Sequence, residues 1–290
     1  MTAAESSGTG PIDRLTHLLV LSRPRFWLYL AGPVVVGVVY AADSTSELLT
    51  PLSVALFAYF LVPANVFLYG VNDVFDADVD AENPKKDEGP EVRFTGDRWI
   101  VFAVILSGLL ALPFALVVGS AGKFTLAAFL VLAVEYSAPP LRFKTTPALD
   151  SLSNGLYVLP GVLAFTAVAG DLPPTPAIVG GWLWTMAMHT FSAIPDIEPD
   201  RRAGIRTTAT VLGRRRTYVY CGSLWALAAG AFALVHPLLG AVLAVYPLVQ
   251  AGIGLSGVAV ERAYWWFPAI NTVVGMALTM GYLWRLMYGG

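Results

Sequence analysis

Two short acidic segments of this 290-residue sequence carry residues whose types and spacing can do chemistry. In the first segment, Asn72, Asp76 and Asp80 are each four residues apart, so on a continuing helix their side chains share one face. In the second segment, Asp196 and Asp200 repeat this spacing. Because like charges at this spacing repel on a bare helix, the pattern predicts a bound cation. Oxygen ligands of this kind suit Mg²⁺, which prefers carboxylates together with phosphate oxygens of a substrate.

Two such clusters facing each other would clamp a diphosphate between metal ions. Bound metals neutralise the charge that develops on a departing diphosphate and so ease its departure. Asp73 lies beside the stripe of the first segment. The alternative interpretation is a pair of solvated acidic loops at a membrane surface. The repeated spacing, at the end of an apolar run in both cases, favours the clamp.

A third segment, residues 136–144, offers positive charge near the same chemistry. Two prolines in it stop the apolar run that precedes it. Arg142 and Lys144 can pair with diphosphate oxygens, the arginine bidentately and the lysine as a point charge. On spacing alone, membrane anchoring by inner-side basic residues explains them equally well, and the same alternative applies to Arg201.

His189 is a further candidate because it lies seven residues, about two helical turns, before Asp196. Its type and position are compatible with a proton acceptor. They are more typical of a hydrogen-bonded histidine in a protein interior.

The elements that must position these residues are membrane helices. The chain is 56% hydrophobic and 13% charged, with a mean hydropathy of +0.65, whereas soluble domains carry about 25% charged residues. Apolar runs long enough to cross a bilayer must be helical, because backbone groups in lipid find no water to bond. The nine predicted spans are 26–42, 51–71, 99–119, 124–138, 152–170, 176–194, 217–236, 238–257 and 264–284.

The charge distribution predicts the orientation of these spans. With the N-terminus in the cytoplasm, 16 of the 18 basic residues fall on the inner side, and only Lys123 and Arg285 fall outside. Of the 20 acidic residues, 17 are also inside, although acidic residues contribute little to orientation. The inner face therefore needs carboxylates for another purpose.

Together these features predict an all-α, multi-pass protein of the cell membrane, with a single integral-membrane domain over residues 1–290. Four spans separate the two acidic segments, so we expect two four-helix halves and a final helix. The acidic loops, on the cytoplasmic side with the N-terminus, would cap a central cavity at the interface of the halves.

The three segments, taken in order, resemble the UbiA-type intramembrane prenyltransferases. Each motif alone is weak, but the ordered set is specific, and the nine spans extend the resemblance over nearly the whole chain. The matching patterns are NDxxDxxxD over 72–80, YSxPPxRxK over 136–144, and DxxxDxxxGxxT at Asp196, Asp200, Gly204 and Thr207.

The resemblance implies roles for the residues of these motifs. The implied Mg²⁺ ligands are Asn72, Asp76, Asp80, Asp196 and Asp200. The residues that we expect to contact the diphosphate are Asn72, Asp73, Arg142, Lys144 and, with the ambiguity given above, Arg201. The residues that we expect to act most directly in catalysis are Asp76, Asp196, Lys144 and Tyr136.

Within that family, one stretch distinguishes branches. Where quinone and haem branches carry an Arg-Pro pair, this sequence reads Asn-Pro-Lys-Lys over 83–86. That stretch, together with the opening over 22–27, is similar to the lycopene elongases that start C50 carotenoid synthesis. The resemblance implies transfer of a dimethylallyl group from dimethylallyl diphosphate to lycopene, with the product cation then losing a proton or taking water.

Two alternatives remain open at this stage. The acceptor could be a quinone precursor, a chlorophyllide or a glycerol-linked lipid. A transporter or Mg²⁺ channel is the alternative from another class, but it predicts ionisable residues deep within the spans. The expected partners are the two substrates and membrane lipids, with no nucleic acid; the sequence does not predict the oligomeric state.

Overall fold

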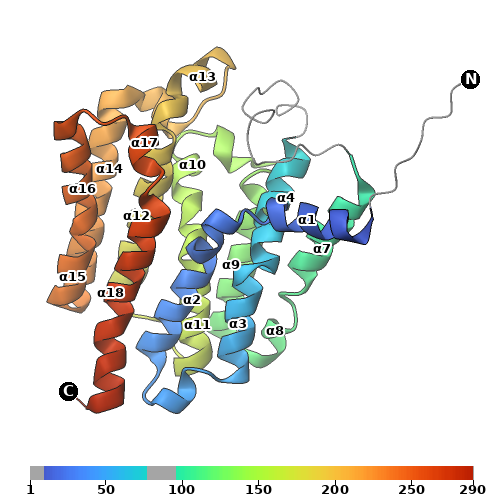
Figure 1. Ribbon diagram of the computed structural model, residues 1–290, viewed down its shortest axis with the longest axis vertical. Helices are drawn as coiled ribbons and strands as arrows, with labels where there is room; N and C mark the ends of the chain where they lie inside the picture. Colours follow the sequence, from blue (N-terminus) through green and yellow to red (C-terminus); the bar gives the residue numbers. More distant parts are fainter. Residues whose placement is uncertain (1–9, 77–95, 290) are drawn as a thin grey trace, which may run out of the picture.

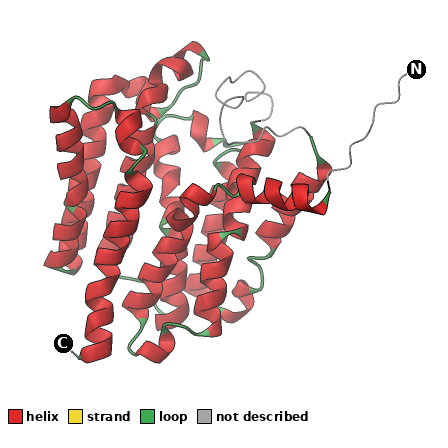
Figure 2. Ribbon diagram, viewed as in Figure 1, coloured by secondary structure: helices red, strands yellow, loops and turns green. Residues whose placement is uncertain are grey.

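The structure, a computed structural model, describes residues 10–76 and 96–289. Within these residues every regular element is helical (Figure 2), which agrees with the predicted all-α class. Most helices run side by side as a bundle, and α1 lies across one end of it (Figure 1). The α-helices are α1 (Pro11–Leu21), α2 (Trp27–Ala41), α3 (Pro51–Leu61), α4 (Pro63–Phe75), α7 (Arg98–Leu109), α8 (Phe114–Val117), α9 (Ser120–Glu135), α10 (Leu149–Leu152), α11 (Leu159–Ala169), α12 (Thr175–Ser192), α13 (Ile197–Arg202), α14 (Thr208–Val235), α15 (Pro237–Leu243), α16 (Val245–Ser256), α17 (Val260–Tyr264) and α18 (Phe267–Tyr288).

Six helical stretches of the described residues are long and apolar enough to cross a membrane. They are Arg14–Ala41, Pro51–Phe75, Arg98–Val117, Leu149–Ala169, Thr208–Val235 and Pro237–Ser256. Helices α9, α12 and α18 occupy the other three predicted spans. The count of nine crossings and their orientation therefore stay predictions.

Several predicted spans are interrupted in the structure. The second is divided into α3 and α4 at Val62, because Pro63 starts a new helix and has no N–H to continue the old one. The first apolar stretch is divided into α1 and α2 near Arg23, whose φ of +50° lies in the left-handed region. This turn is what lets α1 lie across the end of the bundle (Figure 1).

Buried apolar residues of the described chain form two cores. The first draws its members from residues 21–164 and includes the rings of Phe60 and Phe129, whose centroids are 5.1 Å apart. The second draws its members from residues 187–274 and includes Trp225 stacked on Phe267 at 5.9 Å. The division between the cores falls between α11 and α12.

Close packing in the first half depends on two glycines that face each other across α2 and α11. A Cβ added to Gly37 would lie 2.2 Å from the carbonyl oxygen of Gly161, and a Cβ on Gly161 would lie 2.8 Å from the carbonyl oxygen of Pro33. Backbones can approach this closely only where side chains are absent, which is a common device between membrane helices.

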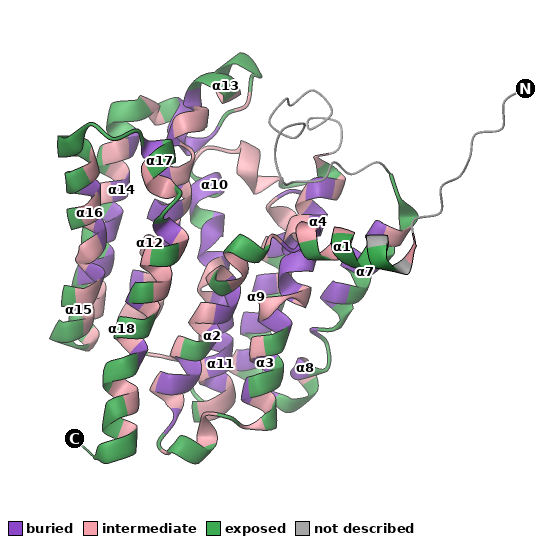
Figure 3. Ribbon diagram, in the orientation of Figure 1, coloured by how far each residue is buried: buried purple, intermediate pink, exposed green. Residues whose placement is uncertain are grey.

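The outer faces of the bundle are apolar. Figure 3 shows buried residues on the faces that helices turn toward their neighbours and exposed residues on the outward faces. Leu116, Leu234 and Leu255 on these outward faces are each at least 80% exposed. An exposed apolar surface of this extent is normally covered by another apolar phase, and the acyl chains of a lipid bilayer can cover it.

Candidate active site

The three sequence motifs lie at the same end of the bundle (Figure 1). The first is at the C-terminal end of α4, the second is the loop that follows α9, and the third is the short helix α13. The described parts of segments that are more than a hundred residues apart in sequence thus lie at one end of the bundle.

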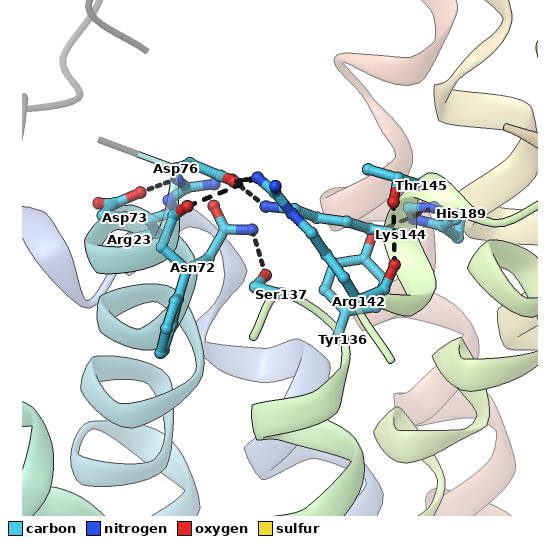
Figure 4. Close-up of polar contacts among 11 residues, drawn as sticks. Arg23, Asn72, Asp73, Asp76, Tyr136, Ser137, Arg142, Lys144, Thr145 and His189 are labelled. Atoms are coloured by element: carbon cyan, nitrogen blue, oxygen red, sulfur yellow. Dashed lines mark hydrogen bonds and ion pairs between the residues drawn. The ribbon is translucent and has the colours of Figure 1, made fainter. Parts of the chain in front are cut away.

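Asp76 is the centre of the polar contacts in the described part of the first motif. Its backbone N–H donates to the carbonyl of Asn72 over 3.0 Å, so the last helical turn places both side chains as predicted. Its carboxylate accepts from Arg142 Nη2 at 3.0 Å through Oδ1 and from Lys144 Nζ through Oδ2 (Figure 4). Two cations from another loop therefore neutralise one carboxylate.

The predicted helix through Asp80 is not seen in the described residues. Helix α4 ends at Phe75, and Asp76 has a C-cap conformation with φ −102° and ψ 2°. Asp80 lies outside the described residues, so its predicted place on the metal-binding stripe stays a prediction.

The loop after α9 folds back so that its cations reach α4. The Lys144 N–H donates to the carbonyl of Tyr136 over 3.0 Å, and Asn72 Nδ2 donates to Ser137 Oγ over 2.9 Å. Arg142 precedes the 3-10 helix Phe143–Thr145 with φ +40° and ψ +58°, a left-handed conformation that L residues adopt at a cost. The loop geometry thus sets where Arg142 and Lys144 point.

Arg23 is a site residue to which the sequence analysis assigned no role. Its Nη2 lies 3.2 Å from Asp73 Oδ1, and its guanidinium lies 4.5 Å from the centre of the Tyr69 ring. Like Arg142, it has a left-handed backbone (φ +50°, ψ +71°) and precedes a 3-10 helix, Pro24–Phe26. The basic, proline-containing opening of the sequence was the available signal, but nothing local connects it to a carboxylate 50 residues away.

The second acidic motif forms a short helix that a glycine ends. Asp196 is the N-cap of α13 and Asp200 lies within it, so the segment predicted as an acidic loop contains a short helix. Gly204 has a φ of +71°, and hydrogen bonds of the Schellman type close the C-terminus of the helix. The glycine of the motif is required by this left-handed turn.

Arg201 points back toward α14. Its Nε and Nη2 both donate to the carbonyl of Thr210, at 3.1 and 2.7 Å, and its Nη1 pairs with Glu198 at 3.1 Å. The carbonyl of Thr210 is a suitable acceptor because Gly213, with φ +71° and ψ +164°, interrupts the helical ladder of α14. The predicted contact of Arg201 with diphosphate stays a prediction.

Asp150 connects the cationic loop to the second acidic motif, and the sequence analysis counted it only as an inner-side acid. It is 1% exposed. Its Oδ2 accepts from the Thr208 N–H at 2.9 Å, and its Oδ1 accepts from the Thr208 hydroxyl. The Ala148 N–H also donates to Thr208 Oγ1 at 2.8 Å. Thr207, the threonine of the third motif, is the N-cap of α14 and forms a capping box. Because Thr208 is the first residue of α14, the hydrogen bonds from Thr208 to Asp150 hold the first turn of that helix in place.

Tyr136 joins the loop after α9 to the middle of the bundle. Its hydroxyl is 3.3 Å from His189 Nε2, and the two rings meet edge to face with centroids 5.9 Å apart. His189 comes from α12, in the second half of the chain.

The ligand chemistry of the acidic motifs fits Mg²⁺, because their side-chain donors are hard oxygens. Among the residues that the structure describes, no group of three or more His, Cys, Asp or Glu side chains gathers closely enough to hold a metal ion. Asn72, Asp76, Asp196 and Asp200 are the described residues that would contribute to such a site.

A helical bundle with an apolar exterior and a charged site at one end is typical of a protein embedded in a membrane. The chain belongs to the UbiA prenyltransferase family, whose family profile matches residues 30–269. It is similar to a lycopene elongase/hydratase of Haloferax volcanii, with 66% identity over 96% of this chain and 92% of that protein. Its fold is similar to structures of a UbiA homologue from Archaeoglobus fulgidus, bound to GPP and Mg²⁺ (TM-score 0.69) or to DMAPP and Mg²⁺ (TM-score 0.68). In both cases the identity is 20% and the alignment covers 91% of this chain and 99% of that chain.

Proposed function

We propose that this prenyltransferase transfers a dimethylallyl group from dimethylallyl diphosphate to the end of lycopene, in a Mg²⁺-dependent reaction that leads toward C50 carotenoids. The observation that carries the choice of acceptor is the 66% identity to a protein named lycopene elongase/hydratase. The donor and the metal are supported by the DMAPP- and Mg²⁺-bound homologue of the same fold.

The charged residues of the site suit the binding of a diphosphate. Arg142 and Lys144 converge on the Asp76 carboxylate from one loop (Figure 4). An incoming diphosphate would replace Asp76 as their anionic partner, the arginine binding bidentately and the lysine as a point charge. Bound Mg²⁺ would supply neutralisation of the charge that develops on the diphosphate as it leaves.

The reaction is an electrophilic alkylation. The C–O bond of the donor breaks, and its electron pair leaves with the diphosphate. The π electrons of the terminal double bond of lycopene form the new C–C bond, and a tertiary cation remains on the acceptor. Because lycopene offers only apolar surface and alkene electrons, its recognition would depend on shape along the helices, away from the charged end.

Expression of the protein in cells that make lycopene, followed by mass analysis of pigments, tests the proposal. We expect C45 and C50 pigments, and in membranes we expect activity to be lost in excess EDTA and restored by Mg²⁺. Cells that accumulate lycopene alone, with extracts that prenylate a hydroxybenzoate or naphthoate, would refute the acceptor. Full turnover in excess EDTA would refute the metal dependence.

A further inference from the structure

The pairing of Tyr136 with His189 bears on how the reaction ends. The Tyr136 hydroxyl lies 3.3 Å from His189 Nε2, and the phenol can donate to this nitrogen when the imidazole carries its proton on Nδ1. The backbone of Tyr136 is tied to the cationic loop, because its carbonyl accepts the Lys144 N–H at 3.0 Å. Lys144 in turn contacts Asp76. The phenol is therefore held next to the place where the diphosphate would bind (Figure 4).

The proposed alkylation needs a proton acceptor near that place. The tertiary cation forms on the acceptor next to the new bond, one carbon from the group that carried the diphosphate. It becomes a neutral product only when a proton leaves, from carbon in an elimination or from oxygen after water adds. The Asp76 carboxylate has another role in the proposed reaction, because it contacts Arg142 and Lys144 and is a proposed Mg²⁺ ligand.

Asp150 is the other buried acid near this pair, and its contacts suit a supporting role. Both of its carboxylate oxygens accept hydrogen bonds from Thr208. It is also close enough to interact electrostatically with His189. Its negative charge offsets part of the cost that burial places on an imidazolium at His189.

We propose that Tyr136 and His189 act together as the proton acceptor when the reaction ends in hydration; this inference rests on the proposed function. In hydration, a lone pair of solvent water forms a C–O bond to the tertiary cation, and an O–H bond of the resulting oxonium breaks. Its proton passes to the Tyr136 oxygen while the phenolic proton passes to His189 Nε2. In elimination, a C–H bond beside the cation breaks, its electrons form the alkene, and the proton passes to solvent water, so this outcome does not need the pair.

The test separates ionisation from termination in the full-length protein in membranes, with lycopene, dimethylallyl diphosphate and Mg²⁺. The variants are His189→Gln and Tyr136→Phe, each checked for folding by thermal melting. Two quantities are measured: the rate of diphosphate release, and the ratio of hydrated to eliminated product, with ¹⁸O from labelled water marking hydration. His236→Asn is the matched control, because His236 caps α15, where asparagine also caps well.

Because ionisation precedes proton transfer, both variants should release diphosphate within about threefold of the wild-type rate. Their product ratio should change by at least about tenfold, in line with the usual contribution of a positioned acid or base. The control should change neither quantity.

An unchanged product ratio in a folded variant of either residue would overturn the inference. A fall in diphosphate release that matches the fall in product would also overturn it, because the pair would then act in binding or ionisation. A wild-type protein that makes no C45 or C50 product refutes the proposed function, and this inference falls with it.

Discussion

The two acidic motifs share one spacing but lie in different surroundings. In the first, Asp73 and Asp76 are held by arginine and lysine side chains that come from other segments, and their side chains are only 6% and 15% exposed. In the second, Asp196 and Asp200 are half-buried, and the arginine beside them, Arg201, donates to the helix that follows.

From the contacts described in each motif, we propose different roles for the two motifs. The first motif has cations beside its carboxylates and can exchange a carboxylate for a phosphate as their partner. The second motif is held in place by helix caps, by the left-handed turn at Gly204 and by the hydrogen bonds between Asp150 and the first turn of α14. We infer that the first motif recognises the diphosphate directly, while the second presents carboxylates from a rigid frame.

The largest expected effect compares Asp76→Ala with Asp196→Ala. Both should lower turnover by roughly 10²–10³-fold, because both remove groups that stabilise charge mainly in the transition state. In the absence of Mg²⁺, only Asp76→Ala should also tighten binding of a non-reactive diphosphate analogue, since Asp76 competes for Arg142 and Lys144. Single-turnover kinetics and analogue binding in detergent measure the two effects. Glu198→Ala is the control, because that side chain is 74% exposed; tighter binding in both aspartate variants would contradict the different roles.

A smaller effect separates the basic residues of the two motifs. Lys144→Met should lower kcat/KM for the allylic diphosphate by roughly 10²-fold, because it removes a charge that faces the leaving group. Arg201→Met should mainly lower the melting temperature, because two of its N–H groups hold the Thr210 carbonyl at the kink of α14. Initial rates give kcat/KM for both variants, and thermal melting gives their melting temperatures. An equal loss of kcat/KM would support the predicted diphosphate contact of Arg201.

Asp150→Asn tests whether the motifs depend on each other. Replacing the carboxylate weakens the hydrogen bonds to Thr208 and should cost about 1–3 kcal/mol of stability. Turnover should fall by about tenfold, since sub-ångström changes in geometry have effects of this size. A double-mutant cycle with Thr208→Val should show that the two losses are not additive. Asp171→Asn, at an exposed position, is the control, and additive losses would show that the two residues act separately.

The smallest effects concern the glycines that shape the second motif. Gly204→Ala and Gly213→Ala should each lower stability by about 1–2 kcal/mol, because both residues have a φ of +71°. Gly230→Ala, in the interior of α14 with open space around it, should be neutral or slightly stabilising. Thermal melting in detergent gives the comparison. A neutral effect at position 213 would mean that the kink is not needed to hold Arg201.

Much of the architecture followed from local patterns. Apolar length and charge asymmetry predicted a helical membrane protein, and the three ordered motifs indicated the UbiA prenyltransferase family, which the family match confirms. These inferences succeed because helical periodicity and hydration depend on residues that are close in sequence. The segment that holds Asp196 and Asp200 was predicted as a loop, and the structure adds a short helix within it.

The partners of the motif residues were decided only by the tertiary structure. Arg23 reaches Asp73 across 50 positions, and Tyr136 reaches His189 across 53. Helix α4 ends at Phe75, and the residues that would carry the stripe on to Asp80 lie outside the described part of the chain. Such contacts depend on left-handed turns and on which helices pack together, and neither leaves a periodic trace in the sequence. The sequence by itself thus determined which residue types gather at one end of the bundle, and the packing of the two halves decided which of them touch.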